Sequence, residues 1–186
     1  MKIAACMTPA VHSIRPEASL SEAASLLWTR DLGVLPVVDE QGLLRGMLTD
    51  RDICMAAFTS GRALHQLVVA NHMASKVFAL MPKDSLATAE KRMAMHQLRR
   101  LPVVDEEGKL VGLLSLADLS RSRLNGARIK ALLAKISAPR AAAESEPVKE
   151  VIPAPPVATR GGKPKPTLKP TPKAGSKRKK SVAKQG

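Results

Sequence analysis

An internal repeat constrains this chain more than any other feature of its sequence. Residues 7–52 align with residues 73–118 without a gap, at an offset of 66, and 18 of the 46 aligned pairs are identical. One supersecondary unit used twice explains such a pattern. A unit of about fifty residues buries too little apolar surface to be stable alone, so we expect the two copies to pack together as one domain.

Each copy predicts a strand, a helix, a β-hairpin and a second helix, in that order. Short strands are expected at 11–15 and 77–81, where a proline follows or ends each one. The hairpin is predicted from two apolar segments joined by an acidic turn that contains glycine. In the first copy these segments are 35–38 and 43–48. The order predicts an α+β module over roughly residues 5–125.

The helices carry recognisable end signals. Ser19 and Glu22 have capping-box spacing. A second helix follows Thr49, with Gly61 at its C-terminal end, and its counterpart is expected to run towards Asn125-Gly126. The apolar face predicted for the first helix consists of Leu20, Ala23, Ala24, Leu27 and Trp28.

The net charge of +14 lies entirely in the last third of the chain. Residues 1–120 carry 13 basic and 13 acidic side chains, whereas residues 121–186 carry 17 basic and 3 acidic ones. Apolar residues at helical spacing predict a short basic amphipathic helix over 126–138. Residues 139–186 hold 9 of the 14 prolines and no aromatic residue. This composition predicts a disordered Lys/Pro/Ala-rich tail.

A tail of this kind is typical of a flexible cation that binds phosphate backbones without reading their sequence. We therefore expect nucleic acid as its partner. An anionic membrane surface, an acidic protein and simple solubilisation are the alternatives.

Composition disfavours several other functions. Aromatic residues make up only 2% of the chain, which argues against proteins that stack bases on aromatic side chains. The two cysteines and four histidines have no metal-ligand spacing, and no catalytic arrangement emerges, so we expect no enzyme activity. The apolar runs are too short for membrane insertion or for a signal peptide, which favours a cytoplasmic protein.

At this level of detail each copy resembles a CBS domain, the unit named after cystathionine β-synthase, and the pair resembles a Bateman module. The resemblance rests on Met-Thr-Pro at 7–9, on Leu-Pro-Val-Val-Asp in both copies, and on the segments 46–52 and 112–118. It places CBS domain 1 at 5–62 and CBS domain 2 at 71–125. It implies a tandem CBS-domain pair of β-α-β-β-α repeats with pseudo-two-fold symmetry, often found as homodimers. Such pairs are regulatory and bind AMP, ADP, ATP or S-adenosylmethionine between the repeats, with no obligatory cofactor.

The segments 46–52 and 112–118 also have physical content of their own, because each places polar groups where a strand leads into a helix. Thr49 and Ser115 stand at helix N-termini, whose free N–H groups and partial positive charge suit a phosphate. Asp52 and Asp118 offer acceptor oxygens for ribose hydroxyls. The plain alternative is that each Ser/Thr and Asp pair only caps its helix.

The remaining predicted ligand residues surround these helix starts. Gly46 and Gly112 are expected to let the backbone approach a ligand. An aliphatic adenine site is expected in each copy, formed by Ser13, Ile14, Leu35 and Pro36 in the first and by Ala79, Leu80, Leu101 and Pro102 in the second.

The two predicted sites differ in charge. Arg51 stands beside the phosphate position of the first site, whereas the second site has no cation at that position, although Arg99 and Arg100 lie just before its hairpin. The first site is therefore expected to bind more tightly.

Two hypotheses follow. The first is a non-catalytic sensor of adenine-containing ligands with a basic tail for a polyanionic partner. The second is a nucleic-acid-associated protein in which the CBS pair serves only as a dimerisation scaffold.

Overall fold

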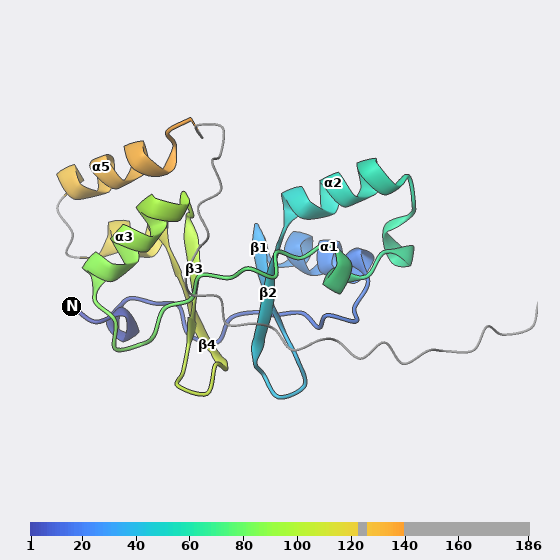
Figure 1. Cartoon of the computed structure of the whole chain (residues 1–186), viewed down its shortest axis with the longest axis horizontal. Helices are drawn as coiled ribbons and strands as arrows, with labels where there is room; N and C mark the ends of the chain where they lie inside the picture. The colour runs from blue at the N-terminus through green and yellow to red at the C-terminus, as the bar shows by residue number, and fades with distance from the viewer. Residues whose placement is uncertain (123–125, 140–186) are drawn as a thin grey trace, which may run out of the picture. The chain divides into compact units, whose positions relative to one another are not determined.

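The computed structural model describes residues 1–122 and 126–139, which contain two small antiparallel sheets with helices packed beside them (Figure 1). The first repeat consists of α1 (Leu20–Thr29), β1 (Val34–Val38), β2 (Leu44–Thr49) and α2 (Asp50–Ser60). The second consists of α3 (Leu86–His96), β3 (Arg100–Val104), β4 (Leu110–Ser115) and α4 (Leu116–Arg121), and α5 (Gly126–Ile136) follows it. Three short 3-10 helices are η1 (Ile3–Ala5), η2 (Leu64–Gln66) and η3 (Val69–Asn71).

The predicted α+β fold is confirmed, and each repeat contains the predicted helix, hairpin and second helix in that order. The capping box of α1 is present, since Ser19 and Glu22 bond each other's backbone N–H groups, and Gly61 ends α2 with a φ of 61°. The strands expected at 11–15 and 77–81 reduce to single parallel bridges, Ile14 to Val37 and Leu80 to Val103. The last predicted helix is shorter than expected, because α4 ends at Arg121 and Gly126 instead begins α5.

The hairpin turns explain why Asp and Gly recur in both copies. Oδ1 of Asp39 accepts the backbone N–H groups of Gln41 and Leu43, at 3.0 and 2.9 Å. Gly42 has a φ of 81°, a left-handed conformation that glycine adopts without steric cost. Burial disfavours the charged form of Asp39, but these hydrogen bonds and Arg45 hold the pKa of its carboxyl below the ordinary value.

The two repeats exchange segments reciprocally. Thr8, at the start of the first repeat, bonds Leu113 on β4 through both backbone groups, at 2.9 and 3.0 Å. Ala74, at the start of the second repeat, bonds Met47 on β2 in the same way, at 3.0 and 2.8 Å. Each residue in one contact lies 66 positions from its counterpart in the other, so the hydrogen bonds follow the pseudo-symmetry of the sequence.

The exchange extends into the two hydrophobic cores. Ile3, from η1, is fully buried in the core of the second repeat, together with Leu80, Leu101 and Leu114. Leu67 and Val69, which precede the second repeat, are buried in the core of the first. Each core is therefore completed by a segment that precedes the other repeat.

Trp28 departs from the predicted apolar face of α1. Leu20, Ala23 and Leu27 are buried as expected, but the Trp28 side chain is 87% exposed. The neighbouring Leu27 is buried in the first core, so Trp28 lies beyond the edge of the buried stripe around the helix and not beyond the end of the core.

After the second repeat, α5 packs on α3 and buries Leu132 and Ile136 in the second core (Figure 1). The basic side chains of this predicted amphipathic helix stay at the surface. The predicted tail at 139–186 lies, apart from Pro139, outside the described residues.

Replacing Ile3 by alanine tests the exchange. The fully buried side chain contacts the second core, so Ile3→Ala should lower the free energy of unfolding by about 2–5 kcal/mol, as measured by urea denaturation. Met95→Ala removes a side chain that is 64% exposed and should change stability by less than about 0.5 kcal/mol. Equal effects of the two substitutions would show that η1 does not belong to the core.

Candidate functional site

The predicted site residues at the start of α2 form a complete capping box. Oδ2 of Asp52 accepts the backbone N–H of Thr49 at 2.8 Å and its hydroxyl at 2.7 Å, and Thr49 Oγ1 accepts the backbone N–H of Asp52 at 3.2 Å. Ser115 and Asp118 repeat this arrangement at α4, at 2.8, 2.6 and 3.2 Å. The capping interpretation is therefore what the structure shows, and one oxygen of each carboxylate serves the helix.

The hydrogen bonding of the other carboxylate oxygen, Oδ1, differs between Asp52 and Asp118. In the second repeat, Asp118 is buried, and its Oδ1 accepts a hydrogen bond from the Arg121 guanidinium at 2.6 Å. Met55 occupies the position equivalent to Arg121 in the first repeat. Asp52 is only half-buried, and the hydrogen bonds that its carboxylate accepts within the described part of the chain, from the Thr49 N–H and hydroxyl, both go to Oδ2. The first repeat thus keeps an acceptor that the second has already used.

Within each repeat the structure brings the predicted segments side by side. Ile14 bonds β1 through its N–H to Pro36 O, at 3.0 Å, and its carbonyl accepts from Val38 N, at 3.0 Å. Leu80 bonds Pro102 and Val104 in the same way, at 2.9 and 2.8 Å. Val34 pairs with Thr49, so β1 lies beside the N-terminus of α2. Arg100 pairs with Ser115, so β3 lies beside the N-terminus of α4.

Several predicted lining side chains point elsewhere. Ile14 and Leu35 belong to the first hydrophobic core, and Leu80 and Leu101 belong to the second. Pro36 and Pro102 are also buried. These six side chains offer no open apolar surface to a base, because core packing already covers them. Ser13 and Ala79 remain partly exposed.

The two predicted glycines serve the segment exchange. A Cβ on Gly46 would lie 2.5 Å from Met73 Sδ and 3.1 Å from the Ala74 carbonyl. A Cβ on Gly112 would lie 2.8 Å from Met7 Sδ and 3.0 Å from the Thr8 carbonyl. The close approach that requires glycine is made by the protein's own backbone rather than by a ligand.

Cations lie unevenly around the helix starts. Arg51, in the first turn of α2, has an exposed side chain. The Arg100 guanidinium belongs to the second repeat but lies 3.5 Å from the position that a Cβ would take on Gly33. Gly33 directly precedes β1. Arg100, which begins β3 of the second repeat, therefore reaches the first repeat.

Two features of the second repeat were not predicted. The Arg92 guanidinium donates a hydrogen bond to the Ala79 carbonyl, and the His96 ring stacks on Phe78 with ring centroids 3.6 Å apart. Burial lowers the pKa of His96, and nearby Lys76 and Arg92 lower it further. The sequence contains a signal for the first contact, since Arg92 replaces the apolar Leu26 at the equivalent position. These contacts hold the 77–80 segment within its own repeat.

Within residues 1–122 and 126–139, no group of three or more His, Cys, Asp and Glu side chains is arranged to hold a metal ion. In the same ranges, every helix is too short or too polar to cross a bilayer.

Comparison with known proteins identifies the repeats. The family model described as "CBS domain" matches residues 3–58 and again residues 69–125. The CBS domain-containing protein YhcV of Bacillus subtilis is 40% identical over 131 residues, which cover 70% of this chain and 91% of that protein.

The structure is also similar to solved structures. CBSX2 from Arabidopsis thaliana, whose structure was determined in complex with AMP, is 29% identical with a TM-score of 0.58, covering 64% of this chain and 93% of CBSX2. Hypoxic Response Protein I, known from Mycobacterium tuberculosis and solved with two coordinated zinc ions, is 28% identical with a TM-score of 0.61. That match covers 67% of this chain and 100% of the solved one.

Removing either cap hydroxyl should destabilise the fold before any ligand is considered. Thr49→Ala and Ser115→Ala should each lower the free energy of unfolding by about 0.5–2 kcal/mol, because a helix N-terminus loses its capping bond. Urea denaturation measures the loss. Ser25→Ala, at an exposed position inside α1, is the control and should have little effect. Unchanged stability in both cap variants would contradict the capping role.

Proposed function

We propose, from the premise that this chain belongs to the CBS-domain family and carries two such domains in tandem, that it is a non-catalytic regulatory module that binds an adenine-containing ligand between its repeats. The ligands considered are AMP, ADP, ATP and S-adenosylmethionine. The AMP complex of CBSX2, at 29% identity, supports an adenine nucleotide.

One observation carries the choice of site. Asp52 uses only Oδ2 in the capping box, so its Oδ1 is available to a ribose hydroxyl. Arg51 is exposed one residue earlier, in the first turn of α2, where the helix dipole also favours a phosphate. Arg100 adds a second cation near the start of β1. An acceptor for ribose and two cations for phosphate therefore lie around one helix N-terminus.

The second site is the weaker one in this proposal. Arg121 already occupies Oδ1 of Asp118, and Ala117 replaces Arg51 at the phosphate position. A ribose hydroxyl would have to displace a charge-assisted hydrogen bond, the kind that contributes most in proteins. The Ala79 carbonyl is also engaged, by Arg92.

The homodimer, the cytoplasmic location and the binding of nucleic acid by residues 139–186 stay predictions from the sequence. The second hypothesis is a nucleic-acid-associated protein with the CBS pair as a scaffold, and a thermal-shift measurement distinguishes it from the first. A specific nucleotide must raise the melting temperature of a sensor by mass action, whereas a scaffold shows no such rise.

Calorimetry of two aspartate variants tests the ranking of the sites. Asp52→Ala should weaken AMP binding by about tenfold or more, since a hydrogen bond to a charged group is lost. Asp118→Ala should weaken it less. Glu22→Ala, which breaks the capping box of α1 away from the site, controls for the loss of a cap. Equal losses in the two aspartate variants would overturn the ranking.

Replacing Arg51 by alanine tests whether this residue recognises the phosphate and not the nucleoside. Arg51→Ala should weaken AMP by about tenfold and leave adenosine unchanged, because adenosine carries no phosphate for the guanidinium. Calorimetry with both ligands measures the difference. A parallel loss for adenosine would mean that Arg51 supports the fold of the site and does not contact phosphate.

A further inference from the structure

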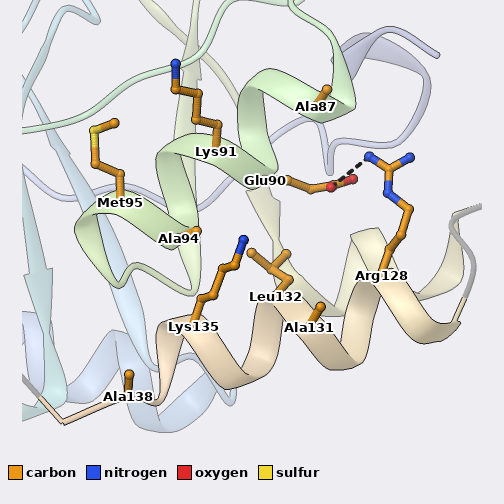
Figure 2. A pocket seen from close by; sticks show the side chains of 10 residues that line it. All are labelled: Ala87, Glu90, Lys91, Ala94, Met95, Arg128, Ala131, Leu132, Lys135 and Ala138. Carbon is orange, nitrogen blue, oxygen red and sulfur yellow. Dashed lines mark hydrogen bonds and ion pairs between the residues drawn. The ribbon is translucent and has the colours of Figure 1, made fainter.

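A groove of about 870 Å³ lies between α3 and α5 of the second repeat. Figure 2 shows Ala87 and Arg128 at one end of it and Met95 and Ala138 at the other. Small apolar side chains from both helices leave room along it for side chains of a further segment. They are Ala87, Ala94, Ala131 and Ala138. We call this hollow the alanine groove.

The alanine groove carries unpaired positive charge. Lys91 and Lys135 line it, and both are exposed and make no ion pair within the described residues. Glu90 and Arg128 also line it, but they are bonded to each other at 2.9 Å, so their charges offset. The two lysines therefore favour an occupant that carries carboxylates.

Glu90 adds a requirement for a hydrogen-bond donor. Its Oε2 accepts from Arg128, whereas its Oε1 is buried and has no donor among the described residues. Buried acceptors in folded proteins nearly always have a partner. A polypeptide segment laid along the groove supplies such donors through its backbone N–H groups.

The chain itself contains a segment of the required charge. Only three acidic residues follow Asp118, and they lie within seven positions of one another, at Glu144, Glu146 and Glu150. Residues 153–186, by contrast, carry 10 basic side chains and no acidic one. We call residues 144–152 the acidic segment.

The sequence of the acidic segment suits a groove with an apolar floor and a cationic edge. Pro147 and Pro153 favour extended backbone in the residues that precede them. In an extended chain, alternate side chains share one face. Lys149, the only cation of the segment, lies on the opposite face to its acids. The face with the acids also carries two branched aliphatic side chains and consists of Glu144, Glu146, Val148, Glu150 and Ile152.

The connection to the acidic segment starts at the groove. The Ala138 carbonyl, at one end of the groove, accepts a hydrogen bond from Gln97 Nε2 at 2.8 Å, which holds the chain against the end of α3. Five residues, 139–143, then lead to the segment, and connections of about two to eight residues commonly join neighbouring elements. The 11 residues of α3 are about 16 Å long, which about five extended residues span.

We propose that the acidic segment of the same chain occupies the alanine groove and runs back along it from Ala138. Its glutamates pair with Lys91 and Lys135, its aliphatic side chains cover the alanines, and a backbone N–H donates to Glu90 Oε1. The short connection gives an effective concentration of about millimolar, so a weak contact is enough to fill the groove. This goes beyond the proposed ligand binding and does not depend on it.

The docking has two consequences. It divides the predicted disordered tail, because the acids stay on the module while the arm beyond residue 152 keeps only basic side chains for a polyanionic partner. It also makes the groove conditional, since any other occupant must first displace the acidic segment.

Zero-length carbodiimide cross-linking of the full-length chain tests the contact, because the reagent joins a carboxylate to an amine that already lies beside it. Mass spectrometry should find glutamates of the acidic segment joined to Lys91 or Lys135. Lys130 is the internal control, since it is exposed on α5 but does not line the groove. Links to the groove lysines should exceed those to Lys130 by about fivefold or more, because docking fixes a contact that a flexible connection only visits.

Variants of the segment test its orientation without altering the folded module. Val148→Ser combined with Ile152→Ser removes the aliphatic side chains that face the groove and keeps every glutamate. The links should then fall to within about twofold of the Lys130 level, because each buried aliphatic side chain contributes about 1.5–3 kcal/mol. Val151→Ser combined with Val157→Ser is the matched control, on the opposite face and beyond the segment, and should leave the links unchanged.

An equal mixture of ¹⁵N-labelled and unlabelled chains shows which copy supplies the segment. Links within one chain support the proposal. Links that join labelled to unlabelled chains as often as random pairing predicts would place the segment of a second copy in the groove, and they overturn it. Groove links no more frequent than those to Lys130, or equal losses in the two double variants, also overturn it, and the groove then serves a different partner.

Discussion

The reciprocal exchange of segments is the constraint on which the rest of this structure depends. Each repeat begins with a segment that bonds to the hairpin of the other repeat, and Ile3 or Val69 carries the exchange into a core. Neither repeat has a complete core without the other, because a unit of this size buries too little apolar surface alone. The exchange also explains Gly46 and Gly112. Their missing side chains leave room for a methionine and a carbonyl, so the backbone of the exchanged segment can lie directly on the strand.

The N-termini of α2 and α4 have the same backbone arrangement but differ in some of their side chains. Both use a hydroxyl and a carboxylate as a capping box, so the residues that stabilise the fold are also the ones proposed to bind the ligand. A few positions then break the symmetry. Arg51 has Ala117 as its counterpart, and Arg121 has Met55. The first change adds a cation to one proposed site, and the second engages an acceptor of the other. The two proposed sites of the duplicated unit thus differ with little change to its fold.

Most of the fold was predictable from the sequence, because the signals involved are local. The capping box at Ser19, the turn at Asp39 and the left-handed Gly61 each act over three or four residues, and the structure contains all of them. The prediction for Trp28 was wrong for a physical reason. Helical spacing describes which residues share a face, but how wide the buried part of that face is depends on what packs against it, and here Leu27 is buried whereas Trp28 is not. Leu35 and Leu101 were similarly predicted to line a ligand site, whereas the opposing helices bury them in the cores.

The sequence by itself determined the repeat, the order of the elements in each copy and the residues that cap the helices, since these depend on spacing and on local hydrogen bonds. Only the tertiary structure decided which repeat receives each segment. The same holds for the ion pair of Arg121 with Asp118 and for the contact of Arg100 with the first repeat. The tertiary structure also decided that α5 forms a groove with α3. These contacts join residues distant in sequence or depend on side-chain direction, and no spacing along the chain encodes which of several chemically suitable partners a side chain meets.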